Sequence, residues 1–126
     1  MRYLLDTNIL IYMLSAPKEL SDPVREVIQR ESCLFVSIVS LWEIGIKQSL
    51  GKLRMALRVP EIEEQCHLRD IRMLPIRANA IERIKTLPDI HRDPFDRLLA
   101  AQALEEGLVI LTCDRMIPHY PVQTVW

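Results

Sequence analysis

The stretch Asp93-Pro94-Phe95-Asp96-Arg97-Leu98-Leu99-Ala100-Ala101-Gln102-Ala103, followed by Gly107 and the apolar run Leu108–Thr112, decides the fold class. Asp93 and Pro94 mark a helix start, because a carboxylate caps free amides and proline fits the first turn. The buried stripe of this helix is predicted to be Phe95, Leu98, Leu99, Gln102 and Ala103. Gly107 ends the helix. The apolar run that follows is typical of a strand in a parallel sheet covered on both faces.

Strand-like and helix-like segments alternate along the remainder of the chain. Strands are predicted over residues 2–5, 33–37, 71–76 and 122–125, and helices over 7–14, from 22, from 37 or 40 to 50, from 60 to 69 and over 78–87. Either Ser37 or Ser40 can cap the helix that stops before Gly51. Pro75 indicates an edge strand at 71–76. The alternation implies parallel βαβ units with right-handed crossovers, and hence an α/β fold.

The composition fits one ordinary domain. The chain has 126 residues, of which 49% are hydrophobic and 26% charged, so it can bury a core. The net charge of −1 predicts no large basic surface, and a nucleic-acid partner would have to be held by a local patch. The chain has no run of about 18 apolar residues and no signal-peptide pattern at its start, so we expect a cytoplasmic protein without membrane contact.

The cysteines and histidines do not form a zinc motif. Cys33, Cys66 and Cys113 are widely spaced, with no Cys-x-x-Cys, and the three histidines make no close pair. We therefore expect the cysteines to be small core residues. His91 is expected to be a loop residue rather than a general base.

Acidic residues stand beside segments that are predicted to be buried. These residues are Asp6, Glu43, Asp96 and Asp114. Buried charge is costly unless it is compensated, and two like charges about 4 Å apart repel by roughly 4 kcal/mol at an effective dielectric near 20. A divalent cation removes this cost, and hard oxygen ligands suit Mg²⁺ or Mn²⁺.

The predicted topology brings these acids to one edge of the sheet. Asp6 and Asp114 follow the carboxyl ends of two strands, and Glu43 and Asp96 lie near the starts of two helices. Ligands of parallel sheets bind outside the carboxyl ends of the strands. The sequence therefore predicts an acidic metal site in a crevice at this edge.

Four segments carry a further pattern, in Leu4–Asn8, Ser40–Ile44, His91–Ala103 and Leu111–Asp114. Their order and spacing resemble the PIN domain family, and more closely the VapC-type toxins of bacterial toxin–antitoxin pairs. The resemblance implies a single-domain, three-layer α/β/α sandwich over residues 1–126 with a mainly parallel central sheet. It also implies Mg²⁺- or Mn²⁺-dependent endoribonuclease activity on RNA, a homodimer, and a small antitoxin that blocks the site.

The resemblance also assigns roles to residues. The metal-binding and catalytic acids of the family fall on Asp6, Glu43, Asp96 and Asp114, and the polar residue after the first strand falls on Asn8. Thr7, Asp93, Arg92 and Arg97 are the expected supporting residues. In this scheme three aspartates hold one or two cations, and Glu43 binds a second cation or orients the attacking water.

Several of these residues also admit a purely structural interpretation. Asp93 fits a helix cap better than a ligand. Glu43 and Lys47 can form an ordinary i, i+4 pair. Arg92 and Arg97 are either solvated charges or partners of the carboxylates or of a phosphate, because the arginine fork suits both.

Two other function classes remain open from the sequence. One is a catalytically inactive PIN-like interaction module, and the other is a Mg²⁺-binding phospho-receiver domain, whose lysine and phospho-accepting aspartate have no clear counterpart here. For the partner, apolar residues interleaved with basic ones over 41–58 predict either a groove for an amphipathic antitoxin helix or simple packing of the domain.

Overall fold

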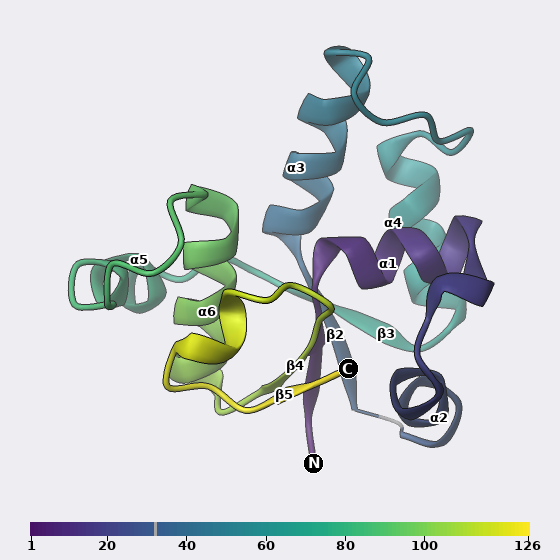
Figure 1. Ribbon diagram of the computed structural model, residues 1–126. Helices are drawn as coiled ribbons and strands as arrows, with labels where there is room; N and C mark the ends of the chain where they lie inside the picture. Colours follow the sequence, from purple (N-terminus) through teal and green to yellow (C-terminus); the bar gives the residue numbers. More distant parts are fainter. Residues whose placement is uncertain (32) are drawn as a thin grey trace.

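The computed structural model describes residues 1–31 and 33–126, and these form a twisted, fully parallel sheet (Figure 1). The strands are β1 (Tyr3–Leu5), β2 (Leu34–Ser37), β3 (Ile71–Leu74), β4 (Val109–Leu111) and β5 (Thr124–Val125). Their order across the sheet is β3-β2-β1-β4-β5, with Leu5 opposite Val36 on one side and Leu111 on the other. The predicted parallel α/β architecture is confirmed.

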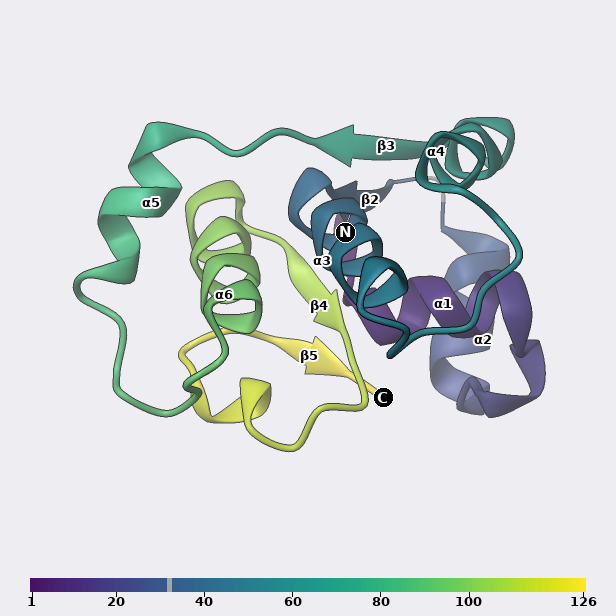
Figure 2. The same cartoon turned by 90° about the horizontal axis from the view of Figure 1, so that it is seen from above.

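Helices connect the strands on both faces. They are α1 (Thr7–Ser15), α2 (Asp22–Arg30), α3 (Ile38–Ser49), α4 (Val59–Leu68), α5 (Ala78–Ile84) and α6 (Pro94–Glu106), with short 3₁₀ turns η1 (Pro17–Glu19) and η2 (Ile117–His119). Seen from above, α5 and α6 lie on one side of the sheet, and α1, α2 and α4 lie on the other (Figure 2). The molecule therefore has three layers.

Each face of the sheet has its own apolar core, because alternate side chains of a strand point to opposite faces. Leu5 belongs to the core that contains α1, α2 and α4, together with Leu41 and Ile44 of α3. Leu4 belongs to the other core, where it packs with residues of α6 and η2. Both leucines are fully buried, so the short β1 strand anchors both layers.

The helix ends follow local chemistry. The Ser37 side chain accepts a hydrogen bond from the amide of Val39, so Ser37, not Ser40, caps α3. Asp93 caps α6 through a 2.8 Å hydrogen bond from the amide of Phe95. Gly107 ends α6 with a φ of 65°, a left-handed conformation that costs glycine little.

Some sequence-based boundaries and packing assignments are wrong. The strand predicted over 71–76 ends at Leu74, because Pro75 cannot donate a ladder hydrogen bond, whereas its predicted position at the edge of the sheet is confirmed. The helix predicted over 78–87 ends at Ile84. Phe95 and Leu98 are only half-buried, because the first turn of α6 lies at the open edge of the sheet, and the buried segment is Leu99–Ala103. Among the cysteines, Cys66 is buried, but Cys33 and Cys113 are partly exposed.

The order of the strands creates a ligand-binding position at the carboxyl edge of the sheet. From β1 the chain proceeds outward through β2 to β3, and then returns to build β4 and β5 on the other side of β1. The carboxyl ends of β1 and β4 therefore flank a topological switch point, where parallel sheets bind ligands. Within the described residues, no helix is long and apolar enough to cross a membrane.

Candidate metal centre

The switch point gathers the acids that the sequence singled out. Asp6 directly follows β1, and Asp114 follows β4. Glu43 comes from the second turn of α3, and Asp96 from the first turn of α6. Burial, together with the nearby charges of Asp6, Asp93, Asp114 and Glu43, raises the pKa of Asp96 to about 8. The predicted cluster is therefore present in the fold.

Asp6 is held at the centre of the site by its own neighbours. Its side chain is 3% exposed and accepts hydrogen bonds from the Thr7 amide and the Thr112 hydroxyl, both at 2.7 Å. The Thr112 hydroxyl oxygen in turn accepts the amide of Asp114 at 2.9 Å. Burial nevertheless dominates and raises the pKa of Asp6 to about 6, with a smaller contribution from Glu43 and Asp114. Thr112 thus links the ends of β1 and β4.

Glu43 is buried although it belongs to an i, i+4 pair. It is 5% exposed, and its Oε1 accepts the Thr7 hydroxyl at 2.7 Å. Its Oε2 lies 2.6 Å from Nζ of Lys47, and this hydrogen bond raises the pKa of the ammonium. The Ser40 hydroxyl lies 2.9 Å from that of Thr7. Glu43 and Thr7 are therefore both buried parts of the site, and Glu43 is not a surface residue.

His91 lies in a loop, as expected, but the sequence did not predict that it contacts the acids of the candidate site. Its Nε2 lies 3.1 Å from Oδ2 of Asp96 and 3.1 Å from Oδ2 of Asp114. The amide of Asp93 points to its Nδ1 at 3.3 Å. His91 lies in an irregular segment before α6, so helical or strand periodicity could not predict its contacts. Its position two residues before the helix cap Asp93 was the one indication in the sequence that it lies near the site.

Hydrogen bonds hold Asp114 in its ionised form. Burial raises its pKa, but the hydrogen bond with His91 and those from the amides of Met116 and Ile117 outweigh burial, and the net pKa is lowered. Asp114 and Asp96 therefore differ although they share the same histidine. At neutral pH without a cation, Asp114 is therefore a charged carboxylate, whereas the raised pKa of Asp96 favours its protonated form.

The supporting residues have mixed outcomes. Arg97 does not contact the carboxylates; it donates to the backbone carbonyls of Ile84, Pro88 and His91 and to the Tyr120 hydroxyl, over 3.0–3.4 Å. Tyr120 also accepts the His91 amide at 2.8 Å. Arg97 thus positions the segment that carries His91. Two further expected residues, Asn8 and Arg92, have exposed side chains.

Comparison with known proteins agrees with this geometry. The family model of the PIN domain matches residues 3–123. This chain belongs to the PIN domain family. Among characterised relatives, it is similar to Ribonuclease VapC22 of Mycobacterium tuberculosis, with 28% identity over 130 aligned positions that cover 98% of this chain and 97% of the relative.

Solved structures share the fold of this PIN domain. VapBC2 from Rickettsia felis, bound to a promoter DNA fragment, superposes with a TM-score of 0.71 at 16% identity, covering 99% of this chain and 98% of the other. DNA-bound VapBC from Salmonella typhimurium gives a TM-score of 0.69 at 22% identity, covering 99% and 97%. The fold is thus that of the VapC structures.

The donor set of this PIN domain fits a divalent cation. His91, Asp96 and Asp114 each offer one ligand atom, and these atoms lie within 4.8 Å of one another. Carboxylate oxygens suit Mg²⁺ and Mn²⁺, and an imidazole nitrogen is also acceptable to Mn²⁺. Burial and the neighbouring acids Asp6, Asp93, Asp114 and Glu43 raise the pKa of Asp96, so a bound cation would compensate the charge of this carboxylate.

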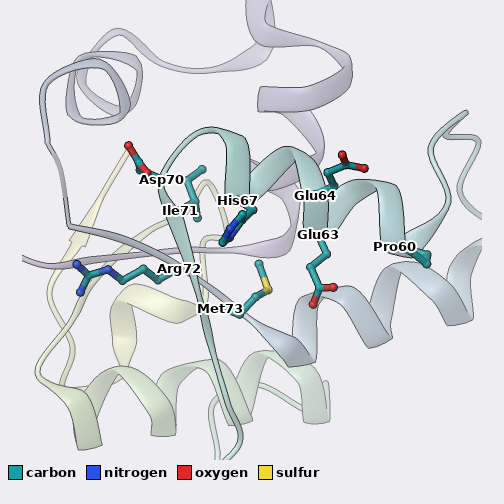
Figure 3. A pocket seen from close by; sticks show the side chains of 8 residues that line it. All are labelled: Pro60, Glu63, Glu64, His67, Asp70, Ile71, Arg72 and Met73. Atoms are coloured by element: carbon teal, nitrogen blue, oxygen red, sulfur yellow. The ribbon is translucent and has the colours of Figure 1, made fainter.

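Another hollow of the PIN domain, about 790 Å³ in volume, lies between α4 and the start of β3. Its lining includes Glu63, Glu64, His67, Asp70 and Arg72. Figure 3 shows these side chains pointing in different directions rather than toward one point. This hollow therefore lacks the convergent side chains that the acidic switch point has.

Proposed function

We propose that this PIN domain is a Mg²⁺- or Mn²⁺-dependent endoribonuclease that acts as the toxin of a toxin–antitoxin pair. The observation that carries the proposal is the convergence of Asp96, Asp114 and His91, beside the buried Asp6 and Glu43, at the switch point of the sheet. The similarity to Ribonuclease VapC22 supports RNA as the substrate.

The residues of the site divide the work. Asp96 and Asp114, with Asp6 behind them, would hold the cation, while Thr112 and the amides of Met116 and Ile117 fix the carboxylates in place. A divalent cation, when bound, would supply positive charge to stabilise the phosphate and the leaving oxygen. Glu43, fixed by Thr7 and Lys47, orients the attacking water. No serine, cysteine or histidine nucleophile is required.

The alternative functions have less support. An inactive interaction module has no need for the four acids, yet the fold pays for burying Asp6 and Glu43 and for crowding Asp96. A phospho-receiver domain is a different family, and the PIN family model matches nearly the whole chain. Hydrolysis of RNA fits both the buried acids and the match to the PIN family.

A cleavage assay tests the proposed activity. We expect the purified protein to cut single-stranded RNA internally in Mg²⁺ or Mn²⁺, to stop in EDTA, and to recover when the cation is restored. Asp6→Asn should remove most of this activity, because the central carboxylate loses its charge while Thr112 keeps a hydrogen-bond partner. Cleavage by Asp6→Asn at the parental rate, or cleavage in EDTA, would show that the nuclease site is elsewhere.

The partner of the toxin is a small antitoxin that docks between α3 and α4. The solved complexes of similar fold pair VapC with VapB. An apolar groove of about 550 Å³ lies here, with Ile38, Trp42, Ile46 and Val59 among its lining residues. Trp42 is 60% exposed and meets the ring of Phe95 edge-on at 5.2 Å, so the groove opens beside the acidic site.

The apolar residues predicted over 41–58 divide between the core and the groove. Leu53, Met55 and Leu57 pack against the core and do not line the groove. The basic residues Arg54 and Arg58 border a separate hollow. The groove accommodates an apolar helix face, and a basic antitoxin side chain can reach the acids from it. A homodimer is proposed as well, and light scattering of the purified protein will test it.

Ile46→Asp tests the groove. The buried charge is expected to weaken the antitoxin complex about a hundred-fold, equivalent to about 3 kcal/mol. Cells that express the parent chain should arrest without the antitoxin and recover with it, whereas Ile46→Asp should arrest them in both cases. Ile81→Asp, at an isoleucine that is 52% exposed on α5, is the control and should be rescued normally. Normal rescue of folded Ile46→Asp removes the groove from the proposal.

A further inference from the structure

The acidic cluster is neutralised unevenly. On one side, Asp96 and Asp114 face the Nε2 of His91, which lies 3.1 Å from each. On the other side, Glu43 faces the ammonium of Lys47 at 2.6 Å. An ammonium is a full positive charge, whereas an imidazole is charged only when protonated. The carboxylate of Glu43 is therefore already paired with a positive charge, whereas Asp96 and Asp114 have an imidazole as their neighbour.

Lys47 is built into the site by the geometry of α3. It stands four residues after Glu43, so the two side chains share one face of the helix. The Glu43 side chain is only 6% exposed, while that of Lys47 is 41% exposed. The ammonium also lies within electrostatic range of Asp93 and Asp96. Its charge is therefore directed into the cluster.

Both oxygens of Glu43 already have protein donors. Oε1 accepts the Thr7 hydroxyl at 2.7 Å, and Oε2 accepts the Lys47 ammonium. A divalent cation on Glu43 would have to displace the ammonium or lie beside it, and like charges at such a distance repel strongly. At Asp96 and Asp114, by contrast, three donor atoms within 4.8 Å suit a cation.

We propose that Lys47 takes the place of a second metal ion at Glu43, so that the site binds a single divalent cation, on the side of Asp96 and Asp114. The inference rests on the proposed metal site, but not on the nature of the substrate. Lys47 is a positioning residue: its ammonium donates to Oε2 of Glu43 and fixes the orientation of the carboxylate without a cation. The contact between Lys47 and Glu43 is not an ordinary i, i+4 pair on the surface, because the Glu43 carboxylate is buried.

The number of bound Mn²⁺ ions tests the inference. By calorimetry, the parent protein is expected to bind one Mn²⁺ per chain. Lys47→Met should bind two, because removal of the ammonium leaves Glu43 as an uncompensated buried carboxylate. The paramagnetic resonance spectrum of Mn²⁺-loaded Lys47→Met should show coupling between two neighbouring ions, which the parent spectrum lacks. Lys47→Gln keeps a hydrogen-bond donor without the charge and should behave in the same way.

Matched variants make the result specific. Lys47→Arg retains the charge and should bind one Mn²⁺. Lys85→Met removes an exposed lysine that pairs with Glu82 at the end of α5, and it too should bind one. Two ions in the parent, or one ion in both folded Lys47→Met and Lys47→Gln, would overturn the inference. If the metal counts are as expected but the parent does not cleave RNA, the inference stands and the proposed nuclease activity falls.

Discussion

Asp96→Asn is expected to lower the rate of RNA cleavage about a thousand-fold and, in EDTA, to raise the melting temperature. The rate falls because a ligand carboxylate is lost, and cation stabilisation of a reacting phosphate is worth several kcal/mol. Stability rises because partial burial and the nearby charges of Asp6 and other acids raise the pKa of Asp96 to about 8. Asparagine keeps the shape of the side chain and removes the charge.

Asp93→Ala is the matched comparison for Asp96→Asn. Asp93 lies three residues earlier and caps α6 through the amide of Phe95. Its loss should cost about 1 kcal/mol, or about 4 °C in melting temperature, while most of the cleavage activity remains. Rate and melting curves of both variants decide the matter. If Asp93→Ala loses activity and Asp96→Asn loses stability, the roles of ligand and cap must be exchanged.

The second large effect is the pH dependence of the metal-free protein. Burial and the neighbouring acids raise the pKa of Asp6 to about 6 and that of Asp96 to about 8, from 3.8 for an ordinary aspartate. Between pH 4 and pH 8 the folded protein therefore binds more protons than the unfolded chain does. Stability must then fall as the pH rises through this window. One pKa unit corresponds to about 1.4 kcal/mol, so Asp6 alone accounts for about 3 kcal/mol.

Melting curves at pH 5, 6, 7 and 8 in EDTA measure this slope, and the expected loss is about 10 °C or more. Mg²⁺ should reverse it, because the cation binds the ionised carboxylates and stabilises the folded state by linkage. The gain from Mg²⁺ should therefore increase with pH. Asp96→Asn should flatten the slope, whereas Asp22→Asn, at an exposed carboxylate, should leave it unchanged. A metal-free protein that becomes more stable from pH 5 to pH 8 contradicts the assignment.

Local chemistry in the sequence was enough for most of the elements. Asp93, Pro94 and Gly107 mark the two ends of α6, because capping and left-handed backbone depend on neighbouring residues alone. The apolar strands and the acids that follow them place Asp6 and Asp114 at the carboxyl edge of a parallel sheet. Glu43 and Asp96 are singled out in the same way, as acids beside segments that are predicted to be buried. Each of these features depends only on the few residues that neighbour it in the sequence.

Boundaries and side-chain environments were less predictable. Phe95 and Leu98 lie at helical spacing with Leu99, yet they remain half-buried, because the first turn of α6 projects to the open edge of the sheet. Arg97 has the residue type that suits a phosphate, yet its donors are used by backbone carbonyls of the preceding segment. Neither outcome follows from spacing, since each depends on which element lies opposite.

The sequence by itself determined the parallel α/β architecture, the helix caps and the acids at the carboxyl edge, because periodicity, capping and strand-end position are local properties of the chain. Only the tertiary structure decided that His91 bridges Asp96 and Asp114, that Thr112 joins Asp6 to Asp114, and that Lys47 faces a buried Glu43. Except for the pair on α3 and the contact of Thr112 with Asp114, these contacts join different segments of the fold. Their distances depend on how the layers pack, and no spacing along the chain contains that information.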